Sequence, residues 1–89
     1  MRDLIWMPLH GGVQGLAFFP NGYGVSVVKH KFSYGYHDDL WELAVLRGKF
    51  DKYELAYDTP ITDDVLGYLT DEAVDDVMRQ IQELDSVKG

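Results

Sequence analysis

The sequence predicts an α+β fold in which an antiparallel meander of about four strands is followed by a short helix and a C-terminal amphipathic helix. Apolar residues alternate with a period of two across much of residues 16–58, as is typical of strands with one buried face. Beyond Pro60 the apolar spacing changes to three and four residues, which is typical of an amphipathic helix. A chain of 89 residues supplies one modest core, so we expect a single domain over residues 1–89.

The first pair of strands is predicted from the turn between them. Pro20 and Asn21 suit the centre of a type I turn, and Gly22 suits the left-handed position that closes a three-residue hairpin loop. We therefore expect one strand over residues 16–19 and a second over residues 23–28, in which alternate residues form an apolar row.

Two more strands are predicted further along the chain. The third covers residues 40–46, and the fourth begins after a turn around residues 47–52 that contains Gly48. One face of these two strands is expected to pack against a helix, and it carries Trp41, Leu43, Val45, Tyr53, Leu55 and Tyr57. The sheet is therefore expected to occupy residues 16–58.

Two helix starts are predicted in the last third of the chain, and we expect a helical segment over residues 62–86. Thr62 suits the N-cap of a short helix and Thr70 the N-cap of a longer one, each with two acidic residues in the first turn. The longer helix is expected to cover one face of the sheet with Ala73, Val74, Val77, Met78, Ile81 and Leu84.

The second face of the predicted sheet is too apolar to face water comfortably. Its apolar residues are Val28, Leu40, Ala44, Leu46 and Ala56. Residues 1–15, predicted as an N-terminal arm, could fold back over this face, or a second copy of the chain could cover it. Both would hold in a dimer with exchanged arms, and a homodimer is expected.

The charge of the chain is uneven and bears on the kind of partner. The formal net charge is −7, and residues 58–89 hold nine acidic residues against two basic ones. This disfavours direct binding to nucleic acid, which needs clustered cations. A protein with a basic surface is the expected partner, and the candidate binding residues on the predicted helix are Glu72, Asp75, Asp76 and Glu83. The alternative is a solvated helix face that only keeps the chain soluble.

A second candidate site lies between the second and third predicted strands. Aromatic residues alternate there beside a lysine and a histidine, and the set is Lys31, Phe32, Tyr34, Tyr36 and His37. Such rings could stack on a nucleobase or wall a pocket for a small molecule. The alternative is that the rings close one end of the core.

Patterns for catalysis and for metal binding are weak. Ser26 lies in a predicted strand, not at the strand-to-helix turn of a nucleophile elbow, and the glycines after His10 lack the following residues of a phosphate loop. His30 and His37, with the two acids that follow, match no standard spacing of metal ligands. We therefore expect no enzyme, no cofactor and no metal site. The chain also has no apolar run of about 18 residues, so no membrane-spanning helix is expected.

Three runs of the sequence, NGYGVSVV, LWELAVL and YDTPITDDVLGYL, resemble a set of small proteins of tailed bacteriophages, over about residues 18–81. The resemblance implies a viral protein that works in the cytoplasm of a host cell. Small acidic phage proteins commonly bind and inhibit a host protein, including a CRISPR or other immune nuclease complex, or sequester a signalling nucleotide. The expected function is therefore that of an anti-defence binding protein. The alternative is a homo-oligomeric binder of a small nucleotide-like ligand.

Overall fold

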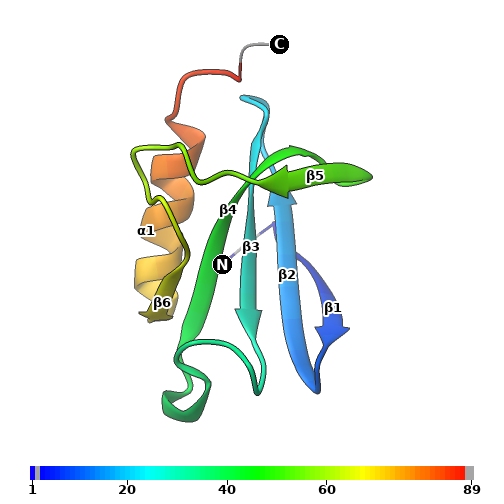
Figure 1. The fold of residues 1–89 in the computed structure, drawn as a ribbon, viewed down its shortest axis with the longest axis vertical. Coiled ribbons are helices and arrows are strands. Elements are labelled where there is room, and N and C mark those ends of the chain that lie inside the picture. Colours follow the sequence, from blue (N-terminus) through cyan, green and yellow to red (C-terminus); the bar gives the residue numbers. More distant parts are fainter. Residues whose placement is uncertain (2, 88–89) are drawn as a thin grey trace.

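The computed structural model describes residues 1 and 3–87 and contains one antiparallel sheet with one α-helix behind it (Figure 1). The strands are β1 (Ile5–Leu9), β2 (Gly12–Phe18), β3 (Tyr23–Lys29), β4 (Trp41–Lys49), β5 (Lys52–Leu55) and β6 (Leu66–Leu69). The helices are the single 3-10 turn η1 (Tyr36–Asp38) and α1 (Asp71–Gln82). The predicted α+β class is confirmed, whereas the expected four strands and additional short helix are wrong in detail.

The sheet follows chain order, and its core lies between the central strands and α1. The order is β1-β2-β3-β4-β5, and β6 pairs with the beginning of β4. Val25 lies opposite Ala17 on β2 and opposite Val45 on β4, so these side chains share the face that α1 covers. The buried cluster on this face consists of Ala17, Val25, Val27, Leu43, Val45, Ala56, Val74, Met78 and Ile81.

The turn between β2 and β3 has the predicted form and a second role. Gly22 has a φ of 90°, and its N–H donates to Phe19 O at 3.0 Å. The side-chain amide of Asn21 donates to Ile81 O at 2.8 Å and to Leu84 O at 3.1 Å. These carbonyls belong to the last turn of α1 and the residues after it, where helical hydrogen bonds run out; Ile81 O also accepts from Leu84 N at 3.2 Å. The hairpin tip therefore caps the helix from a distant part of the sequence.

Residues 1–15 do not form a separate arm, because they contain β1 and the beginning of β2. His10 and Gly11 join the two strands with φ values of 49° and 78°, which are the positive values that a two-residue type I′ turn requires. Pro8 lies in β1, the edge strand, opposite Val13. Because proline has no N–H, it blunts an edge that would otherwise pair with another strand.

The helix predicted at Thr62 is absent. Thr62 Oγ1 accepts a hydrogen bond from Asp64 N in a local turn, and the chain then enters β6, which pairs with the start of β4. Gly67 disfavours a helix there, and the free edge of β4 supplies ladder hydrogen bonds. The prediction for α1 is confirmed at its start, where Thr70 Oγ1 accepts from Ala73 N at 3.2 Å. The helix ends at Gln82 instead of residue 86.

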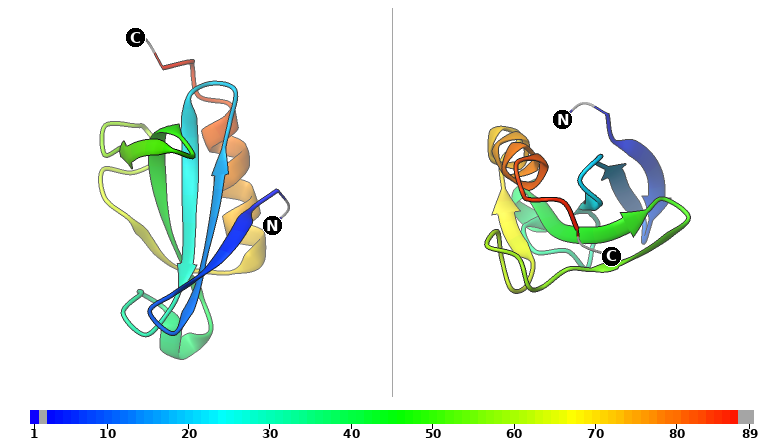
Figure 2. Two further views of the ribbon diagram at one scale, coloured as in Figure 1. Left: turned by 90° about the vertical axis from the view of Figure 1, so that its right-hand side faces the viewer. Right: turned by 90° about the horizontal axis from the view of Figure 1, so that it is seen from above.

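The second face of the sheet is largely buried within the chain itself. Figure 2 shows α1 on one side of the sheet and β5 on the other. The ring of Phe18 lies 5.3 Å from that of Tyr53, although β3 and β4 separate their strands in the sheet. On this face of the curled sheet Leu16, Val28, Ala44 and Leu46 are buried. The homodimer was predicted because this face was expected to be exposed. That reason no longer holds, and the homodimer stays a prediction.

Glycine permits the curl at Gly24 and Gly48. A Cβ at Gly24 would lie 2.6 Å from the ring of Phe18, which folds over this position toward β5. Gly48 has a φ of 131°, and a Cβ there would lie 2.4 Å from Lys52 O. Contrary to expectation, Tyr53 and Leu55 do not face α1, because the curled β5 leaves both side chains about half exposed on the other side.

Candidate interaction surface at the β3–β4 loop

The loop over residues 30–40 has a fixed backbone. His30 O accepts hydrogen bonds from Ser33 N at 2.9 Å and from Ser33 Oγ at 2.8 Å, and Ser33 Oγ accepts from His30 N at 3.0 Å. Both residues are buried. Further along, Gly35 O accepts from Asp38 N and from Leu40 N, and this closes the loop before β4 begins. The loop is thus ordered by hydrogen bonds within its own sequence.

The aromatic residues of this loop point outward instead of closing the core. Phe32 is 69% exposed, Tyr34 60% and Tyr36 38%. Tyr34 N donates to Glu42 Oε1 at 3.0 Å, which ties the middle of the loop to β4. The structural alternative, in which these rings seal the core, is therefore wrong, and their role in binding stays a prediction.

A fourth exposed ring comes from β6, and the sequence analysis missed it. Tyr68 is 59% exposed and has a φ of 58°, a left-handed value that is uncommon for a residue with a side chain. The register of β6 against β4 shifts at this point, because Trp41 pairs with Leu69 whereas Leu43 pairs with Leu66. The extra residue forms a bulge, which re-aims the side chain. Nothing local in the sequence predicts this conformation.

Two glycines bring β6 and the loop into close contact. A Cβ at Gly67 would lie 2.7 Å from the Cβ of Tyr34, and a Cβ at Gly35 would lie 3.1 Å from the Cα of Tyr68. The backbones therefore approach as only glycine allows, and Tyr34 and Tyr68 lie at the same end of the molecule. We call the surface formed by Phe32, Tyr34, Tyr36 and Tyr68 the aromatic end; its loop joins β3 to β4 at the bottom of Figure 1.

The other predicted residues of this site support the rings. Lys31 Nζ lies 5.1 Å from the centroid of the Phe32 ring, and the rings of Tyr36 and His37 lie 5.5 Å apart. Beneath Phe32 the ring of His10, from the β1–β2 turn, packs edge-on at 5.3 Å. The predicted ligand-binding set is therefore a group of exposed rings with a lysine and a histidine beside them.

The four predicted acidic residues lie on α1 and at its C-terminal end, and two of them have partners within the chain. Asp75 pairs with the N-terminal amine of Met1 at 2.6 Å. Asp76 pairs with Arg79, although the sequence analysis gave no such pair. Glu72 and Glu83 are exposed. The acidic face is therefore partly neutralised. Of the four predicted residues, Glu72 and Glu83 have no ion-pair partner among the described residues.

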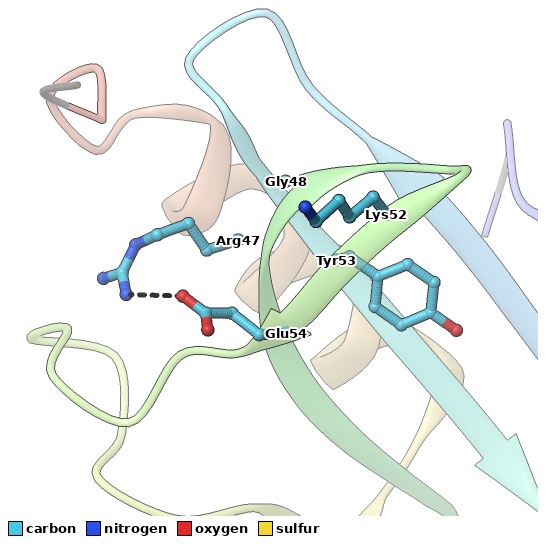
Figure 3. Close-up of a pocket in the computed structure, with 5 residues that line it drawn as sticks. All are labelled: Arg47, Gly48, Lys52, Tyr53 and Glu54. Carbon is cyan, nitrogen blue, oxygen red and sulfur yellow. Dashed lines mark ion pairs between the residues drawn. The ribbon is translucent and has the colours of Figure 1, made fainter.

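Three pockets among the described residues lie away from the aromatic end. One, of about 370 Å³, is lined by Arg47, Gly48, Lys52, Tyr53 and Glu54 (Figure 3). Another, of about 380 Å³, is lined mainly by apolar residues of the β2–β3 turn and adjoins Arg47 and Gly48. A third, of about 280 Å³, lies between Met1 and α1. None of them includes a ring of the aromatic end.

One of the two cations that line the first pocket, Arg47, is already matched within the chain. Arg47 binds Asp58, and its other guanidinium nitrogen lies 3.8 Å from Glu54. The hydrogen bond to Asp58 raises the pKa of Arg47 above its usual value, and the same bond holds the pKa of Asp58 below its usual value. A bound anion would have to compete with these carboxylates for Arg47.

Comparison of the chain with protein-family models, with curated proteins and with solved structures gave no match. Among residues 1 and 3–87, no three His, Cys, Asp or Glu side chains gather closely enough to hold a metal ion. No helix within these described residues has the length and apolar character needed to cross a membrane.

Proposed function

We propose that the chain is a protein-binding protein, not an enzyme, and that it docks onto its partner through the aromatic end. The observation that carries the proposal is the display of four aromatic side chains, between 38% and 69% exposed, on a backbone fixed by its own hydrogen bonds. Aromatic residues are enriched in protein interfaces and supply many of the residues that dominate binding energy.

The order of the loop favours binding further. A loop that is already fixed loses little conformational entropy when a partner docks on it. Residues 31–37 read Lys-Phe-Ser-Tyr-Gly-Tyr-His, and combinations of tyrosine, serine and glycine are typical of antibody loops that bind proteins. In such loops the aromatic rings provide rigid contact area, and the small residues provide adaptable hydrogen bonds. The aromatic end has both features.

The alternative proposal, a nucleotide-like ligand held by the same rings, has less support. A small ligand usually binds in a concave site that covers most of its surface. The rings of Phe32, Tyr34 and Tyr68 are exposed by more than half, and the pockets described above lie elsewhere. An exposed cluster of rings suits a protein surface better than it suits a mononucleotide.

The resemblance to phage proteins suggests what the partner is. We propose a host protein, such as a defence nuclease complex, which the chain inhibits in the host cytoplasm by covering a functional surface. A net charge of −7 would speed association with a basic partner at low salt. Glu72 and Glu83 are the exposed helix acids placed to contribute to this attraction.

The test is capture of a partner from a host lysate by the tagged chain, followed by affinity measurement with the purified partner. The double variant Phe32→Ala/Tyr34→Ala is expected to weaken binding at least tenfold, because truncating a central aromatic residue of an interface costs about 1–4 kcal/mol. The matched control is Phe50→Ala/Tyr57→Ala, which removes the same two ring types, about half exposed, on either side of β5.

The control pair is expected to bind like wild type. The variant Glu72→Lys/Glu83→Lys should slow association in a salt-dependent way and leave the dissociation rate nearly unchanged. If the Phe32 and Tyr34 variant binds as tightly as wild type, the aromatic end is not the interface. Recovery of a nucleotide from heat-denatured wild type, absent from that variant, would support the ligand alternative.

A further inference from the structure

We infer that the aromatic end is pH-sensitive: protonation of His30, which lies beneath Phe32, opens the loop. The inference deepens the proposed function, and its effect on binding rests on that function. The opening itself is a property of the loop and is testable without a partner.

The key contact is a hydrogen bond to a ring nitrogen. His30 is 8% exposed, and its Nδ1 accepts from Phe32 N at 3.1 Å. An imidazole nitrogen that accepts a hydrogen bond carries no proton, so this bond requires the neutral ring. Protonation at Nδ1 would turn the acceptor into a donor that faces another donor. The bond that holds Phe32 in place would then be lost.

The surroundings leave the ring of His30 little room to adapt. The strand β2 packs so closely that a Cβ at Gly12 would lie 2.9 Å from the Cβ of His30. The ring of His10 meets that of His30 edge-on at 5.1 Å, and it also supports Phe32 at 5.3 Å. Protonation of both histidines would place two cations side by side beneath the same aromatic residue.

The charged groups near the pair do not offer His30 a free counter-ion. They are His10 from the β1–β2 turn, Lys31 from the loop, Glu42 from β4, and Lys29 with Asp39. The carboxylate of Glu42 accepts from Tyr34 N, and Asp39 pairs with Lys29 at 3.0 Å. Both acids are engaged in holding the same loop. A proton on His30 would therefore be stabilised only by disturbing a contact that orders the aromatic end.

The size of the effect follows from proton linkage. The closed loop requires the neutral ring and the open loop does not, so the ratio of open to closed loop rises as the pH falls, by at most about tenfold for each pH unit. His37, which packs on Tyr36 at the surface, makes no such bond among the described contacts. It provides an internal control.

The experiment is nuclear magnetic resonance of the full chain, labelled with ¹⁵N, at pH 7.5 and pH 5.5. The protection of the Phe32 and Ser33 amides against hydrogen exchange, corrected for the intrinsic rate, is expected to fall at the lower pH, by at most about tenfold for each pH unit. In His30→Asn, the side-chain oxygen takes the place of Nδ1 as acceptor and does not titrate, so the protection should stay constant. His37→Asn should respond to pH as wild type does.

Two results would overturn the inference. One is unchanged protection at Phe32 while the ring signals of His30 show that it has become protonated. The other is an equal pH response in wild type and His30→Asn. Should His30→Asn fail to fold, the first result still decides, because amide protection and the ring signals of His30 are both measured on wild type. A loop that opens while partner affinity stays the same at both pH values would support the inference and overturn the proposed interface instead.

Discussion

Replacement of Asn21 by aspartate is expected to destabilise the chain by removing the cap on α1. The amide of Asn21 donates to Ile81 O at 2.8 Å and to Leu84 O at 3.1 Å, and Asn21 Oδ1 accepts from Tyr23 N at 3.0 Å. Aspartate keeps the shape and the bond from Tyr23, but it cannot donate to the carbonyls when ionised. It also places a negative charge at the negative end of the helix dipole.

The magnitude follows from these two losses. Two hydrogen bonds at about 0.5–1.5 kcal/mol each and an unfavourable dipole contact of about 0.3–1 kcal/mol give a total of about 1–4 kcal/mol. For a domain of this size, each kcal/mol lowers the melting temperature by about 4–8 °C. Thermal unfolding followed by circular dichroism at pH 7 is therefore expected to show a decrease of about 5–30 °C.

Gln80→Glu is the matched control, because it adds one negative charge to the last turn of α1 at an exposed position. It isolates the dipole contribution and should cost no more than about 1 kcal/mol. An Asn21→Asp protein that melts within 2 °C of wild type at pH 7 would refute the capping argument. Equal losses in both variants would show that charge, not the lost hydrogen bonds, explains the effect.

Further predictions concern the sheet, the core and assembly. Gly48→Ala should lower stability by more than about 2 kcal/mol in urea unfolding, because its Cβ would lie 2.4 Å from Lys52 O; an unchanged midpoint would contradict the curl of β5. Ile81→Ala should lower the free energy of unfolding by about 2–5 kcal/mol in the same assay, since Ile81 is fully buried. A loss below about 1 kcal/mol would show that α1 does not pack on the sheet through Ile81. In sedimentation velocity, a monomer at micromolar concentration would overturn the expected homodimer.

The elements predicted correctly are those that local chemistry decides. Pro20, Asn21 and Gly22 specify their turn within four residues, and Thr70 caps the first turn of α1 with its own hydroxyl. Neither signal depends on distant parts of the chain. The start of α1 and the β2–β3 hairpin could therefore be predicted from the sequence.

The elements that were missed depend on distant partners. β1 has an apolar sequence without clear alternation, and only pairing with β2 makes it a strand. The four residues of β6 also follow a helix-start pattern, and the free edge of β4 decides between the two. The charge of the acidic face also depends on a distant partner, because Asp75 pairs with the N-terminal amine. Pairings of this kind leave no periodic trace in the sequence.

Tyr68 has a strained backbone and also belongs to the proposed interface, and two substitutions distinguish these two roles. Tyr68→Ala removes the ring and keeps a Cβ at a φ of 58°, whereas Tyr68→Gly removes both. A left-handed conformation costs a residue with a Cβ about 1–2 kcal/mol. Glycine avoids this cost but loses about 0.5–1 kcal/mol because it makes the unfolded chain more flexible, so Tyr68→Gly should be the more stable of the two by up to about 1.5 kcal/mol.

Partner binding is expected to respond differently, because both substitutions remove the same exposed ring. Each should weaken binding by a similar factor of at least five, measured by titration calorimetry with the captured partner. Wild-type affinity in both variants would place Tyr68 outside the interface and leave the bulge with a purely structural role. Greater stability of the alanine variant would instead show that the backbone at residue 68 is not left-handed. If Tyr68→Gly is the more stable variant and both variants bind equally weakly, the chain tolerates backbone strain at this position in order to present the ring.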